Sequence, residues 1–167
     1  MMTLEVVELM HSMAQRTRVW RERAIKGYQK FGSDDLGYRP DSGMSSFGWL
    51  LAHQAAVYDY SLNVLIKGGS PKNPDLFKMH TPGTDGDWTG VSLKDIEDYY
   101  TSSEEDLLAY VRDANDEQLV LVPEHDMPEP FRGMRVIDLI ANTFVHLGHH
   151  NGHLNTIVQE LTKKAMK

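Results

Sequence analysis

Cysteine is absent from this chain of 167 residues. The absence excludes disulfides, thiolate nucleophiles, iron–sulfur clusters and cysteine-ligated zinc sites, and it favours a reducing, cytoplasmic setting. Basic residues are also few, because 17 Lys and Arg stand against 24 Asp and Glu and give a net charge of −7. We therefore expect no nucleic-acid partner and no anionic-membrane surface.

Long apolar runs are missing as well, since none approaches the roughly 20 residues that span a bilayer. The first residues, Met1 to Glu5, lack a cationic leader followed by an apolar run, so we expect no secretory signal. Hydrophobic residues make up 41% of the chain and charged residues 25%. That composition is sufficient for one buried core, and the length predicts a single domain over residues 1–167.

The spacing of the apolar residues predicts four long helices, because apolar positions recur at steps of three and four. Ser45 or Ser46 can cap the second helix, and Ser92 with Asp95 resembles a capping box at the start of the third. Four long helices with long connections favour an all-α four-helix bundle. The predicted helices are residues 3–31, 46–67, 93–114 and 136–161.

The connections are rich in Gly and Pro. Residues 32–43 are predicted to be a loop, and residues 72–90 are too interrupted by Gly and Pro for a regular element. A long connection of this kind is either a functional lid or a tolerated surface insertion. Residues 119–135 are compatible with a short extended β-hairpin before the last helix.

Two other patterns are interpreted as structural. The acidic run 104–106 indicates a solvated helix face, and the tyrosine pairs Tyr58/Tyr60 and Tyr99/Tyr100 indicate core or interface packing.

Four of the eight histidines lie within one stretch of the last predicted helix. At about 100° per residue, His150 lies inside the apolar sector and His146 at its edge, whereas His149 points away and His153 lies on the border. Residues four apart on a helix have Cβ atoms about 6 Å apart, so two imidazoles can bind one metal ion. His146 and His150 are the better inward pair, and His149 and His153 are the alternative.

His53 is a third candidate ligand, on the second predicted helix. Apolar and aromatic residues flank it at helical spacing, among them Trp49 and Tyr60. One such histidine is more often a core residue than a ligand, but adjacent buried imidazoles are costly unless something uses their nitrogens. A metal ion does so, and the three histidines together predict a metal site.

The segment Trp49-Leu50-Leu51-Ala52-His53, combined with His146-x-x-His149-His150-x-Gly152-His153-Leu154, resembles the signature of the DinB-like superfamily. Its members are metal-binding four-helix bundles, and the resemblance extends from the first helix to Leu161. It implies that His53, His146 and His150 are the metal ligands and that the chain forms a homodimer. Many relatives carry Gln at the position of His153, so this histidine is a candidate fourth ligand, hydrogen-bonding partner of a ligand, or proton shuttle.

Three neutral imidazoles leave an open position on the metal, which is the pattern of catalytic rather than closed structural zinc. Zinc or nickel suits imidazole best. Such a site predicts a metal-dependent hydrolase acting on a small-molecule substrate. The resemblance also implies a transferase that uses a low-molecular-weight thiol, which a chain without cysteine must take from a cofactor. The alternative is a non-catalytic metal-binding or stress-response bundle in which the metal is structural.

Residue type alone makes several side chains candidates for a general base. Four familiar patterns are missing: the Glu-x-x-His pairs of di-iron centres, a phosphate-binding P-loop, a Gly-x-Ser-x-Gly elbow and His-Glu-x-x-His. His11, His80 and His149 have no predicted role. The candidate bases are His153, Asp59, Tyr60, Glu124 and His125.

Overall fold

The computed structural model describes residues 4–31, 35–41 and 43–167, with side chains described from Val6 onward. The predicted helix start at Thr3, and positions 32–34 and 42 of the predicted loop, lie outside the described residues. The described part of the chain is mostly helical and contains no strand, as expected for an all-α bundle. The long helices are α1 (Leu4–Phe31), α2 (Phe47–Asp59), α4 (Leu93–Asp113) and α6 (Val136–Ala165), and the short ones are α3 (Pro74–Met79) and α5 (Asp116–Val120).

Local capping explains where the long helices begin. The Ser46 hydroxyl accepts a hydrogen bond from the Trp49 amide at the start of α2, and Ser92 and Asp95 form a capping box at the start of α4. α2 continues directly into a π-helical segment, η1 (Tyr60–Ile66). Gly68 follows with a φ of +66°, a left-handed conformation that glycine adopts without strain and that ends the helix.

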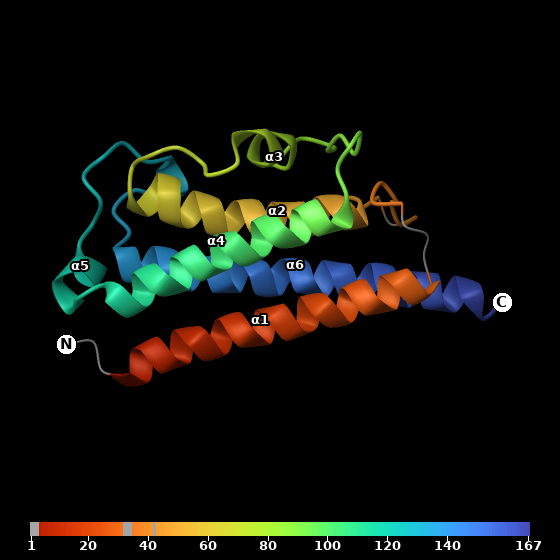
Figure 1. The fold of residues 1–167 in the computed structure, drawn as a ribbon, viewed down its shortest axis with the longest axis horizontal. Helices are drawn as coiled ribbons and strands as arrows, with labels where there is room; N and C mark the ends of the chain where they lie inside the picture. Colours follow the sequence, from red (N-terminus) through yellow and green to blue (C-terminus); the bar gives the residue numbers. More distant parts are fainter. Residues whose placement is uncertain (1–3, 32–34, 42) are drawn as a thin grey trace.

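The directions in which the long helices run explain the longest connection of the bundle. α1 packs beside α6, and α2 packs beside α4 (Figure 1). α2 and α4 run in the same direction, so the chain must return along the length of the bundle before α4 can begin (Figure 1). Residues 68–92 make this return over the outer side of α2 and carry α3; we call them the return segment.

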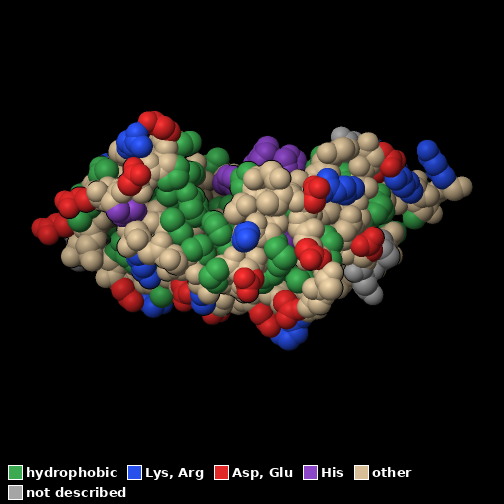
Figure 2. Space-filling model, turned by 90° about the horizontal axis from the view of Figure 1, so that it is seen from above, with side chains coloured by type: hydrophobic (Ala, Val, Ile, Leu, Met, Phe, Trp, Pro, Cys, Tyr) green, Lys and Arg blue, Asp and Glu red, His purple; other side chains and the backbone are tan. Residues whose placement is uncertain are grey.

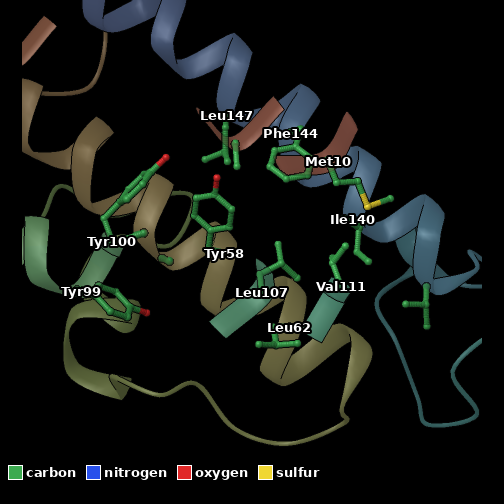
Figure 3. Close-up of a cluster of buried hydrophobic side chains, with 14 of the residues drawn as sticks. Met10, Tyr58, Leu62, Tyr99, Tyr100, Leu107, Val111, Ile140, Phe144 and Leu147 are labelled. Carbon is green, nitrogen blue, oxygen red and sulfur yellow. The ribbon is translucent and has the colours of Figure 1, made fainter. Parts of the chain in front are cut away.

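One core cluster lies between α1, α2, α4 and α6 (Figure 3). The rings of Tyr58 and Tyr100 meet edge to face with centroids 5.2 Å apart, and Phe144 lies 6.3 Å from Tyr58 on the other side. Tyr99 is buried too, so the predicted packing role of these tyrosines is confirmed. Tyr60 is only partly buried.

The prediction of a solvated acidic face is wrong for Glu104, which is 0% exposed. Its carboxylate accepts hydrogen bonds from the Arg18 guanidinium, with Nε at 2.9 Å, and from the Tyr58 hydroxyl at 3.2 Å. Beside it the Arg21 guanidinium lies 3.2 Å above the Tyr100 ring centroid, in a cation–π contact. A buried carboxylate is tolerated here because charged and hydroxyl donors satisfy it.

Two connections also differ from expectation. Within the return segment, Asn73 caps α3 and Pro74 occupies its first turn, so a short helix forms where none was predicted. The predicted hairpin over residues 119–135 is wrong, because a capping box at Asn115 starts α5 and a 3₁₀ helix, η2 (Glu129–Phe131), follows. The backbone bond from the Val136 amide to the Leu121 carbonyl, 2.9 Å long, closes this connection.

Replacing Glu104 by Ala should lower the free energy of unfolding by about 2 kcal/mol, because hydrogen bonds to charged groups contribute about 1.5–3 kcal/mol each and Arg18 is partly solvated. Denaturant unfolding followed by circular dichroism measures the change. Glu105→Ala, at an exposed position one residue along, is the matched control and should stay within about 0.5 kcal/mol of the parent protein. Equal stabilities of the two variants would contradict the buried ion pair.

Candidate metal site

Three histidine side chains from α2 and α6 converge in the middle of the bundle. His146 Nε2 lies 3.0 Å from His53 Nε2 and 2.9 Å from His150 Nε2. All three candidate ligand atoms lie within 4.8 Å of one another. His53 is buried, whereas His146 and His150 are partly buried. The inward pair predicted on the last helix therefore meets the predicted histidine of the second helix.

The orientation of His53 is fixed from both sides. Its Nδ1 lies 2.8 Å from the backbone carbonyl oxygen of His80, and since a carbonyl only accepts, Nδ1 carries the proton. Nε2 then carries the lone pair and faces His146. The Trp49 ring stacks on the imidazole with centroids 4.5 Å apart and an interplanar angle of 14°, and the Trp49 indole in turn donates to the Thr84 hydroxyl.

Burial keeps these imidazoles neutral at pH 7. Desolvation is the largest cause of the lowered pKa of His53, which is about 4, and of His150, which is about 3. The neighbouring imidazoles lower both values further, and desolvation also lowers the pKa of His146. Neutral imidazole is the form that binds metal ions.

This donor set fits a divalent transition metal ion. Three imidazole nitrogens are typical ligands of zinc and nickel, and a carbonyl that holds the far ring nitrogen of a ligand is the usual means of orienting it. Within the described residues, the cluster contains no carboxylate and no fourth histidine. It can therefore hold a metal ion through three protein nitrogens.

The chain matches the model of a known protein family. The model of the DinB superfamily matches residues 17–154, which include all three clustered histidines. The chain belongs to the DinB superfamily. Among curated proteins, no sequence matches this chain.

Two other histidines of this DinB-superfamily chain, His149 and His153, lie beside the cluster rather than in it. His149 is exposed, and its ring lies 4.3 Å from that of His153. The His153 ring centroid is 5.5 Å from that of His150, and its pKa is lowered, chiefly by desolvation. The alternative pair, His149 and His153, is thus adjacent to the cluster on the outer side of α6.

Of the candidate general bases, Asp59 has a structural role. It is 1% exposed, and its carboxylate accepts hydrogen bonds from the Asn63 amide, from the backbone amides of Lys72 and Asn73, and from the Tyr99 hydroxyl. These donors occupy its lone pairs and anchor the start of the return segment to the end of α2. Glu124 and His125 lie in the connection after α5, outside the walls of the cavity described below.

His80 is the residue that sequence reasoning missed. It is 0% exposed in the return segment, and its Nδ1 donates to the Leu76 carbonyl. Its backbone oxygen binds His53, and His80 is also one of the residues that line the neighbouring cavity. Every residue has such an oxygen, so no side-chain pattern in the sequence could have revealed this contact.

A cavity of about 440 Å³ opens beside the cluster. Its wall includes two of the three clustered histidines, His53 and His146. It also includes Tyr60, which is a candidate general base on residue type alone. In Figure 2 hydrophobic side chains gather left of centre, and histidines lie beside them toward the upper edge of the view. Among the described helices, none has the length and hydrophobicity needed to cross a membrane.

Replacing Asp59 by Ala should loosen the return segment, because the amides of Lys72 and Asn73 lose their acceptor while Tyr99 keeps a buried hydroxyl. We expect faster amide hydrogen exchange over residues 72–84 and a loss of about 2 kcal/mol of stability. Asp98→Ala, which removes an exposed carboxylate paired with Lys94, is the control. Unchanged exchange in Asp59→Ala would show that the anchor does not hold the segment.

Proposed function

We propose that the chain is a metal-dependent enzyme in which His53, His146 and His150 hold one divalent transition metal ion beside a substrate cavity. The observation that carries the proposal is that two of the three clustered histidines also line the cavity. A molecule in the cavity is therefore next to the ligand atoms. A bundle that used a metal only to join two helices has no need of this arrangement.

The number of histidines also favours an enzyme over a structural metal site. Structural zinc sites are closed by four protein ligands, whereas catalytic sites keep a position for water or substrate. The described cluster offers three ligands. We propose zinc or nickel as the metal, since both suit imidazole.

When bound, such a metal supplies a Lewis acid and lowers the pKa of a water or thiol that it binds. The chain's own residues would then hold the ion, orient the imidazoles through the His80 carbonyl, and enclose the substrate. Hydrolysis is one reaction that suits this site. Transfer of a low-molecular-weight thiol to an electrophile is the other, and the thiol would be a cofactor because the chain has no cysteine.

Several finer expectations stay proposals. We propose a homodimer because the family commonly forms one, and we propose a cytoplasmic location and a small-molecule substrate from the sequence. The role of His153 as a fourth ligand, as a partner of a ligand or as a proton shuttle is also still a prediction.

Replacing His150 by Ala should abolish stoichiometric metal binding, because it removes one of three ligands. The measurement is elemental analysis of protein purified without an affinity tag, combined with melting curves at added zinc or nickel. At a metal concentration of about 100 Kd, the bound ion should stabilise the parent fold by about 2.7 kcal/mol, and the variant should lose this gain. His149→Ala, at the exposed neighbouring position, is the control and should keep the metal. A parent protein with no transition metal would refute the site.

Enzymatic activity can be tested by screening esters, amides and electrophiles, the latter with several low-molecular-weight thiols. We expect turnover of at least one class by metal-loaded protein, lost on chelation and in His150→Ala but kept in His149→Ala. Failure of every class, with a melting temperature that falls on chelation, would favour the structural alternative.

A further inference from the structure

The cavity beside the histidine cluster has no charged wall. None of its fifteen lining residues is Lys, Arg, Asp or Glu. Aliphatic and aromatic side chains make up most of its surface, and its volume of about 440 Å³ is within the range of about 300–1,000 Å³ that is usual for small-molecule sites. The wall therefore offers apolar contact over most of its area.

Aromatic rings from three elements form one part of this wall. The Tyr60 ring of η1 stacks near Phe77 of α3, with centroids 5.7 Å apart, and meets Phe131 of η2 edge to face at 6.0 Å. Both phenyl rings thus contact Tyr60, and all three rings line the cavity. Aromatic pairs gain about 0.5–1.5 kcal/mol beyond area burial, so a flat aryl group suits this wall.

The buried hydroxyl groups of the wall are already paired. Ser61 and Thr143 are both buried, and their oxygens lie 2.7 Å apart. Thr143 also lies 3.0 Å from the carbonyl oxygen of Leu139, one turn earlier in α6. These hydroxyls satisfy each other and the backbone, so they do not balance the charge of an ionised ligand.

An ionised group in such a cavity loses its hydration and gains no charged partner from the wall. His80 Nε2, a buried wall nitrogen without a hydrogen-bond partner, carries a lone pair because Nδ1 donates to Leu76, so it does not donate to an anion. Burial of an unpaired charge is far more costly than burial of an uncharged polar group. The wall therefore discriminates against carboxylates and phosphates and in favour of neutral ligands.

We propose that this cavity binds an uncharged aryl or branched alkyl group of the substrate, with the reactive polar centre at the end formed by His53 and His146. The inference deepens the proposed function, and its catalytic part rests on it, but binding of the apolar group needs no metal. A charged thiol cofactor, where one is used, has its ionised groups outside the cavity.

Two probes of equal shape test the proposal on the metal-free full-length protein: 2-naphthamide, which is neutral, and 2-naphthoate, which is anionic at pH 7. Isothermal titration calorimetry should show at least about ten-fold tighter binding of 2-naphthamide. Equal or tighter binding of 2-naphthoate, or no measurable binding of 2-naphthamide, would overturn the proposal.

Phe131→Lys tests whether the cavity is the site of this selectivity. Phe131 is half-buried, and a lysine there adds a cation to the wall. The affinity for 2-naphthoate should therefore rise at least about ten-fold relative to the affinity for 2-naphthamide. Val122→Lys adds the same charge at an exposed position outside the wall. It should keep the ratio of the two affinities found in the parent protein. If Phe131→Lys does not fold, Phe77→Ala serves instead and should weaken 2-naphthamide binding. Parent-like binding in the folded variant used would place the probe elsewhere and overturn the proposal.

Elemental analysis of the same proteins separates this proposal from the proposed function. Selective binding of 2-naphthamide by a protein that takes up no transition metal would leave the cavity assignment standing and remove the enzyme proposal. Stoichiometric metal with no binding of 2-naphthamide would leave the enzyme proposal standing and overturn the cavity assignment.

Discussion

The hydrogen bond from His53 Nδ1 to the His80 carbonyl oxygen connects the two parts of the molecule that make the site. One part is the bundle, which carries the three histidines, and the other is the return segment over α2. The bond fixes which nitrogen of His53 carries the lone pair. It also holds α3 and Phe77 over the cavity. The geometry of the cluster and the shape of the cavity therefore depend on the same contact.

The return segment follows α2 in reverse order, as the parallel directions of α2 and α4 require (Figure 1). Asp59 holds Lys72 at one end, His53 binds His80 in the middle, and Trp49 donates to Thr84 further along. A connection of this length is therefore part of the site rather than a surface insertion. Its contacts are mainly with backbone atoms, which tolerate changes of side chain.

Much of the fold and the core of the site could be predicted from the sequence. Helical periodicity revealed the four long helices, and the i, i+4 spacing of His146 and His150 identified their shared face. Glu104 was misjudged because the other two members of its acidic run, Glu105 and Asp106, are exposed, while its partners, Arg18 and Tyr58, come from other helices. The role of His80 and the cavity wall depend on tertiary contacts, and no local pattern records those.

The origin of the cavity wall has a consequence for the selectivity of the proposed enzyme. Phe77 and Phe131 belong to the short helices of the connections, whereas the histidines belong to α2 and α6. Substitutions of these two phenylalanines can thus reshape one part of the wall while the histidines stay as they are. Most of the remaining wall belongs to α2, η1 and α6. In the proposed enzyme, divergence among relatives or redesign in the laboratory can therefore alter selectivity at these two positions, as long as the return segment keeps the His80 carbonyl beside His53.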